Sequence, residues 1–205
     1  MSPKISDDQK EQRRRKILEA AKQVFIDKGY EPATLKDIVE EAGMSRGWIY
    51  LYFQTKEEIF EALLDLQDSE YERYIESLLA EKPLIWEVIQ TTFTQQKKEL
   101  LLPERGSLMP AFYEYFLTGW RKEQRRSLLL KRYENGITLF EKLLQLGVDQ
   151  QEFAPIMPIG DIARIIASFQ EGIMTHTFAV GSEQAHTENQ LAAMTNYLNQ
   201  LLSPM

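Results

Sequence analysis

The chain has 205 residues, a hydrophobic content of 43%, a formal net charge of −7 and no cysteine. This length allows one large or two small domains, and the apolar content is sufficient for a buried core. The absence of cysteine excludes disulfides and thiolate metal sites. The polar start of the chain and the lack of an apolar stretch of about 18 residues predict a cytoplasmic protein that does not span a membrane.

The negative charge is concentrated in the later part of the chain. Residues 1–56 hold 11 Lys and Arg against 9 Asp and Glu, whereas residues 57–205 hold 13 against 22. The first segment therefore carries a charge that permits binding to a polyanion. A solvated helix surface is the alternative interpretation of its densest basic cluster, which comprises Lys10, Arg13, Arg14, Arg15 and Lys16.

The stretch that begins at Thr34 has the pattern of two short helices joined by a tight turn. Thr34 is the predicted N-cap of the first helix, and Gly43 supplies the left-handed conformation that lets the chain reverse. In the second helix Ile49 and Phe53, four residues apart, are expected to face inward. This pattern predicts a helix-turn-helix whose outer surface contacts DNA grooves and phosphates. The residues expected on or beside that surface are Ser45, Arg46, Gly47, Trp48, Tyr50 and Tyr52.

The same stretch resembles the DNA-binding domain of the TetR family of bacterial transcriptional repressors. The family pattern is met by Ala42, Gly43, Ser45, Gly47, Tyr50, Tyr52, Phe53 and Lys56, and upstream by Lys16, Ile17, Leu18, Ala20, Ala21, Phe25, Gly29 and Tyr30. Trp48 and Leu51 depart from the pattern. The resemblance covers about residues 13–63, and it implies that the basic cluster with Arg15 lies near the DNA backbone.

Contacts with double-stranded operator DNA are expected to divide by role. At least one of Arg46, Trp48 and Tyr50 is predicted to read base edges, and the predicted phosphate contacts are Thr34, Tyr52 and Lys56.

Amphipathic helical patterns continue to the end of the chain and predict an all-α fold of about nine helices. We expect a three-helix DNA-binding domain over residues 1–56 and an effector-binding and dimerisation domain over residues 57–205. A long helix that starts at Thr55 is expected to link the two domains. Pro110 lies within a predicted helix, where it is expected to introduce a kink.

The last two predicted helices carry apolar stripes that favour a homodimer. A pair of helices from each subunit would form a four-helix bundle, which is also how TetR-like proteins dimerise. The alternative is that these stripes pack only on the core of their own subunit. The residues predicted at the interface are Ile162, Ile166, Phe169, Ile173, Leu191, Met194, Leu198 and Leu201.

Large aromatic residues and methionines in the middle of the chain predict a cavity for a small apolar or amphipathic effector. They occur in the helices that enclose an effector site in TetR-like proteins, although such residues also form ordinary cores. The predicted lining residues are Trp86, Phe93, Met109, Phe112, Tyr113, Phe116, Trp120, Tyr133 and Phe169.

Catalysis has little support in the sequence. The two histidines, His176 and His186, have no nucleophile motif around them, and no phosphate-binding loop or metal-ligand pattern is present. We therefore predict a dimeric repressor, without cofactor or metal, that binds a palindromic operator and is released by a small molecule. The alternatives are a regulator or activator controlled by a partner instead of a ligand, and an enzyme or carrier that uses the helical cavity.

Overall fold

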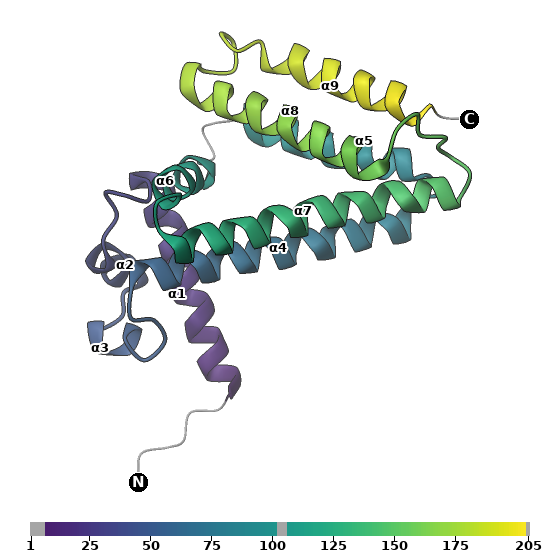
Figure 1. Cartoon of the computed structure of the whole chain (residues 1–205). Coiled ribbons are helices and arrows are strands. Elements are labelled where there is room, and N and C mark those ends of the chain that lie inside the picture. The colour runs from purple at the N-terminus through teal and green to yellow at the C-terminus, as the bar shows by residue number, and fades with distance from the viewer. Residues whose placement is uncertain (1–6, 102–105, 204–205) are drawn as a thin grey trace. The chain divides into compact units, whose positions relative to one another are not determined.

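The computed structural model describes residues 7–101 and 106–203. Within these ranges the regular elements are nine α-helices (Figure 1), which confirms the predicted all-α fold. None of the described helices is both long and apolar enough to cross a membrane. The helices are α1 (Asp7–Lys28), α2 (Leu35–Ala42), α3 (Arg46–Ile49), α4 (Lys56–Glu81), α5 (Ile85–Leu101), α6 (Met109–Gly119), α7 (Glu123–Asp149), α8 (Ile159–Val180) and α9 (Thr187–Leu202).

The described chain divides into two compact units. The first comprises residues 7–73 and 106–119, and the second comprises residues 74–101 and 120–203. Helix α4 therefore contributes its first part to one unit and its last part to the other. This division differs from the boundary expected after residue 56, because α6 and most of α4 belong to the same unit as the helix-turn-helix.

An aromatic cluster explains why α6 belongs to the first unit. Phe25, Tyr30, Phe60 and Tyr115 are almost completely buried, and their ring centroids lie 4.8–5.8 Å apart in the five pairs that touch. Such pairs add about 0.5–1.5 kcal/mol each beyond the burial of their area. The hydroxyl of Tyr115 also donates to the carboxylate of Glu61 at 2.6 Å. One ring from α6 thus completes a core formed by α1, the turn after it and α4.

Pro110 does not kink α6, contrary to the expectation from the sequence. It is the second residue of the helix, in the first turn, where a backbone N–H has no intrahelical acceptor. A proline removes nothing from the hydrogen-bond ladder at this position, and its fixed φ suits the start of a helix. Pro110 therefore lies at the beginning of a regular helix.

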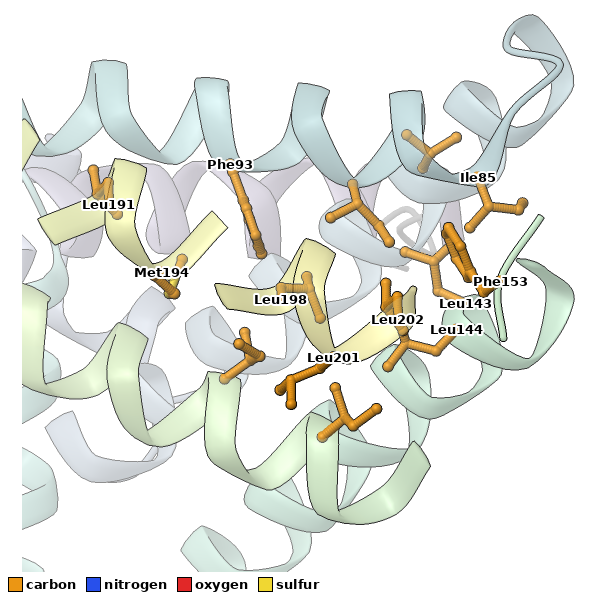
Figure 2. Packing of buried hydrophobic residues seen from close by; sticks show 14 of the residues in the cluster. Ile85, Phe93, Leu143, Leu144, Phe153, Leu191, Met194, Leu198, Leu201 and Leu202 are labelled. Atoms are coloured by element: carbon orange, nitrogen blue, oxygen red, sulfur yellow. The ribbon is translucent and has the colours of Figure 1, made fainter. Parts of the chain in front are cut away.

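The second unit has a core formed by α5, α7, α8 and α9. Figure 2 shows Phe93 of α5, Leu144 of α7 and Leu198 of α9 pointing into this core, together with Phe153 from the loop before α8. The ring of Phe153 packs against Gly147, where a Cβ atom would lie only 2.2 Å from it. A larger residue in place of Gly147 would displace this ring, so the glycine permits the loop to cover the end of the core.

The start of α5 is capped by a side chain distant in the sequence. The carboxylate of Glu152 accepts hydrogen bonds from the N–H groups of Ile85 and Trp86, at 2.7 and 2.8 Å. A helix N-terminus presents unpaired N–H groups and a partial positive charge, both of which a carboxylate satisfies. The loop after α7 is thereby attached to α5 by a charge-assisted contact as well as by the packing of Phe153.

Candidate nucleic-acid interface

The recognition unit begins with a capping box at the start of α2. The hydroxyl oxygen of Thr34 accepts from the Asp37 N–H at 3.2 Å, and the Asp37 carboxylate accepts from the Thr34 N–H at 2.9 Å. At the other end of α2, Gly43 has a φ of 58° and Met44 N–H donates to the Val39 carbonyl. The predicted cap and the predicted left-handed turn are therefore both present.

Helix α3 is shorter than the second helix predicted from the sequence. It spans Arg46–Ile49, after which Leu51 and Tyr52 N–H groups bond to the carbonyls three residues before them. These tight turns carry Phe53 back into the core, where Ile49 and Phe53 are both buried as predicted. Ser45 precedes the helix but makes no side-chain cap, so its hydroxyl is not used in this way.

The outer surface of α3 carries an arginine and three aromatic side chains beside it. Arg46 is exposed, and its Nη2 donates to the Tyr50 hydroxyl at 2.9 Å, with the guanidinium carbon 5.4 Å from the Tyr50 ring centroid. Trp48 is 37% exposed and Tyr52 is half-buried. A Cβ atom at Gly47 would meet no atom of the described chain within 4 Å, so packing within the unit does not require a glycine there.

The basic cluster of α1 lies beside this surface, but its arginines have different surroundings. The guanidinium of Arg13 covers the ring of Trp48, with its central carbon 4.1 Å from the ring centroid. Arg15 is exposed and lies 3.5 Å from the carboxylate of Glu11, which also approaches Arg14 at 3.9 Å. Arg13 therefore contacts α3 through Trp48.

A carboxylate also lies at the predicted phosphate-binding end of α2. Asp37 contacts the Lys28 ammonium at 2.8 Å and receives bonds from the hydroxyl and N–H groups of Thr34. The hydrogen bond from Lys28, followed by those from Thr34, lowers the pKa of Asp37 from the ordinary 3.8 to about 2. An unpaired Asp37 carboxylate would repel a phosphate bound at Thr34. The positive charge of Lys28 neutralises this carboxylate and so reduces the repulsion.

Lys56 bonds to the turn between α1 and α2, which gives it a structural role, and the phosphate contact expected for it stays a prediction. Its Nζ donates to the carbonyls of Tyr30, Glu31 and Ala33 at 2.7, 3.0 and 2.8 Å, and it lies 4.5 Å from the centroid of the Tyr30 ring. An ammonium group has three donors, and these three carbonyls use all of them. Lys56 therefore stabilises the turn between α1 and α2.

The same turn is held from its other side by α6. The carboxylate of Glu114 accepts from the Glu31 N–H at 2.9 Å, and the hydroxyl of Thr118 donates to the Glu31 carboxylate at 2.9 Å. Gly29 has a φ of 81°, and a Cβ atom there would lie 2.5 Å from the Glu114 carboxylate. Sequence patterns did not reveal these contacts, because their partners are separated by more than 80 residues.

The residues predicted to line an effector site are divided between the two units. Met109, Phe112, Tyr113 and Phe116 lie on α6 in the first unit, and Trp86, Phe93, Trp120, Tyr133 and Phe169 lie in the second. Within the second unit, Phe93 is buried in the core and Trp86 packs edge-to-face on Phe153. Trp120, Tyr133 and Phe169 are exposed. Neither unit by itself therefore brings all nine residues to one site, and the effector cavity stays a prediction.

Two open grooves lie on the described surface of the second unit. One, of about 300 Å³, is lined by α7 and the start of α8, including Glu141 and Ile159. The other, of about 390 Å³, is lined by Arg164, Ile165, Ser168 and Phe169 of α8. Phe169 is thus the one predicted effector residue that borders either of these two grooves.

Seven of the eight residues predicted at a dimer interface are buried in the core of the second unit. The cause is that α8 and α9 use these stripes to pack on each other and on α5 and α7, as Figure 2 shows for α9. Phe169 is the exception, with 47% of its surface exposed and its ring 5.8 Å from that of Tyr197 on α9. The seven core residues are Ile162, Ile166, Ile173, Leu191, Met194, Leu198 and Leu201.

Comparisons with known protein families agree with this architecture. Residues 17–63 match the family model described as bacterial regulatory proteins of the tetR family. Residues 89–188 match the model described as the tetracyclin repressor-like C-terminal domain. Both the helix-turn-helix and most of the second unit are therefore covered.

Individual relatives extend the match over the whole chain. An uncharacterised HTH-type transcriptional regulator of Bacillus subtilis, YfiR, is 38% identical over 202 residues, which cover 98% of each chain. The HTH-type transcriptional repressor AcnR of Corynebacterium diphtheriae is 43% identical over 61 residues, which cover 30% of this chain and 32% of that protein. A solved structure of a TetR transcription regulator from Haloarcula marismortui has the same fold, with a TM-score of 0.75, 18% identity and coverage of 94% of this chain and 99% of that one. The chain belongs to the TetR family of helix-turn-helix transcriptional regulators, which are not enzymes.

Proposed function

We propose that this regulator is a repressor that binds a palindromic operator as a homodimer and is released by a small apolar or amphipathic molecule. The observation that carries the DNA-binding part is the exposed surface of α3, where Arg46 and Trp48 project while Ile49 and Phe53 anchor the helix in the core. The similarity of the first unit to a protein named as a repressor supports the direction of control. A fragment of genomic DNA from the region upstream of the coding sequence is the first duplex to test.

Arg46 is the strongest candidate for a base contact. It is exposed, and the Tyr50 hydroxyl holds its guanidinium beside α3. An arginine at this position binds the edge of a guanine through two parallel donors, which gives sequence selectivity. Thr34 and Tyr52, at the flanks of the recognition unit, are proposed to contact phosphates.

Replacement of Arg46 tests this assignment. Arg46→Ala is expected to weaken operator binding by about 1–3 kcal/mol per half-site and to leave binding to random DNA nearly unchanged. Fluorescence anisotropy with both duplexes measures the two effects. An equal loss on operator and random DNA would show that Arg46 contacts a phosphate instead of a base.

The homodimer is required by the small size of the recognition helix. A helix of this kind reads only a few base pairs, so specific binding needs two half-sites about 34–36 Å apart on one side of the duplex. We propose that the exposed faces of α8 and α9 form the interface, with Phe169 and Tyr197 at its centre. Support comes from the 47% and 37% exposure of these two touching rings, which a monomer leaves in water.

Release by an effector is proposed to act through α4, which is continuous from Lys56 to Glu81 and belongs to both units. A ligand that binds the second unit would change the spacing of the two recognition helices in the dimer. A coupling of about 1–3 kcal/mol would lower operator affinity about 5- to 150-fold, and the operator would weaken ligand binding by the same factor. Calorimetry of a bound compound with and without operator tests this, and equal affinities would refute release by that compound.

A further inference from the structure

Arg13 and Trp48 form a contact between α1 and the recognition helix. The guanidinium carbon of Arg13 lies 4.1 Å from the centroid of the Trp48 ring. At this distance the positive charge lies over the negative face of the indole, which attracts it. Both residues belong to the first unit, and Trp48 lies in α3 itself. Trp48 therefore restricts where the Arg13 side chain can point.

Arg13 differs from its neighbours because it has no anionic partner among the described residues. Arg14 and Arg15 both lie within 4 Å of Glu11, whereas the Nη1 of Arg13 is buried and makes no hydrogen bond. A buried donor without an acceptor is costly, and the face of an aromatic ring does not replace an acceptor in the plane of the guanidinium. Arg13 thus carries a positive charge, without a described anionic partner, beside the DNA-facing helix, and its side chain is partly exposed.

The surroundings of α3 in a DNA complex indicate which group the partly exposed Arg13 guanidinium would meet. The major groove is about 12 Å wide, and an α-helix with its side chains has a diameter of about 10–12 Å, so an inserted helix fills the groove. A side chain that reaches the flank of that helix from a neighbouring helix therefore meets the wall of the groove. That wall is formed by phosphates, which accept hydrogen bonds from guanidinium groups.

We propose that Arg13 is a phosphate contact whose position is set by Trp48. This inference rests on the proposed DNA-binding function and assigns a partner to one side chain of the same surface. Trp48 is then a positioning residue: its ring face is covered by Arg13, and its contribution to DNA binding passes through that arginine. A tie that only holds α1 and α3 together would leave the number of phosphates bound by the protein unchanged, so the two interpretations predict different salt dependence.

The test is a double-mutant cycle measured by fluorescence anisotropy with an operator duplex and a scrambled duplex over a series of salt concentrations. Arg13→Ala is expected to weaken binding to both duplexes about tenfold per subunit, the lower end for a hydrogen bond to a charged group. The salt slope is expected to fall by about 0.9 per lost phosphate contact in each subunit. Trp48→Leu should weaken binding in the wild-type background but have no further effect in Arg13→Ala. Trp48→Phe retains a ring face and should restore most of the affinity.

Arg15→Ala is the matched control, since it removes the same charge from the same helix at a residue that does not touch Trp48. The effects of Arg15→Ala and Trp48→Leu on the free energy of DNA binding should be additive. Additive effects of Arg13→Ala and Trp48→Leu, or an unchanged salt slope in Arg13→Ala, would overturn the inference. A loss confined to the operator duplex would also overturn it, because it would make Arg13 a base contact. If the wild-type protein binds the two duplexes equally, the proposal of operator-specific binding is refuted. The effect of Arg13→Ala on binding to both duplexes still tests the phosphate contact. If it binds neither, both proposals fail.

Discussion

Replacement of Lys56 by methionine tests the structural role of this residue directly. Methionine keeps the apolar stem of lysine and removes the ammonium group that bonds to the carbonyls of Tyr30, Glu31 and Ala33. Three carbonyls in the turn after α1 then lose their shared donor. The turn connects α1 to the recognition unit, so its loosening is expected to lower the stability of the first unit.

The expected loss of unfolding free energy is about 2–4 kcal/mol. Hydrogen bonds to a charged group contribute about 1.5–3 kcal/mol each, which sets an upper limit of about 4.5–9 kcal/mol for three bonds. The value is reduced because Lys56 is half-buried, one of the bonds is exposed, and water replaces part of what is lost. With a slope of about 2 kcal/mol per molar urea, in the middle of the usual range, the midpoint should fall by about 1–2 M.

Urea unfolding followed by far-ultraviolet circular dichroism measures this midpoint. Lys36→Met is the matched control. Lys36 is exposed and forms an ion pair with Glu40 at 3.5 Å, so the loss of this surface pair should change stability by less than about 0.5 kcal/mol. At low urea the salt slope of DNA binding should be the same for Lys56→Met as for the wild type. If stability is unchanged and the slope falls by about 1, Lys56 is a phosphate contact and the structural argument is refuted.

The remaining predictions concern three other parts of the molecule. Because the pKa of Asp37 is lowered to about 2 by its bonds with Lys28 and the α2 cap, its contribution to stability should be complete above pH 4 and disappear as the pH falls towards 2. Asp37→Asn should remove this part of the pH dependence in urea unfolding, and an unaltered pH profile would contradict the assignment. Phe169→Glu should convert the dimer to monomer in sedimentation without loss of folding, whereas Leu198→Ala, in the core, should lower the unfolding free energy by about 2–5 kcal/mol. Gly29→Ala should cost more than about 1 kcal/mol in urea unfolding, because φ is 81° and the new Cβ would approach a carboxylate at 2.5 Å; wild-type stability would show that the turn adapts.

Local features of the fold were predictable from the sequence. The cap at Thr34, the left-handed turn at Gly43 and the inward positions of Ile49 and Phe53 depend on residues within one or two helical turns of each other. Hydrophobic periodicity likewise predicted the α-helices, because an amphipathic helix repeats its apolar positions along its own length. The extent of α3 was overestimated, since periodicity alone does not distinguish an α-helical turn from the tighter turns that follow Ile49.

Periodicity shows which side of a helix is apolar but not which neighbour covers it. The stripes of α8 and α9 that favoured a dimer interface are covered within the same subunit, and Phe169 is the member left exposed. The sequence also did not separate a lysine that faces DNA from one that faces three carbonyls. That distinction depends on the path of the chain between Tyr30 and Lys56.

The sequence by itself determined the helix-turn-helix, the all-α class and the family, because these depend on short-range patterns of caps, glycines and apolar spacing. Only the tertiary structure decided that α6 completes the core of the first unit, that Lys56 and Glu114 hold the turn after α1, and that Arg13 covers Trp48. Each of these contacts joins residues at least 23 positions apart. Their formation depends on how whole helices pack, which the local preferences of the individual residues do not specify.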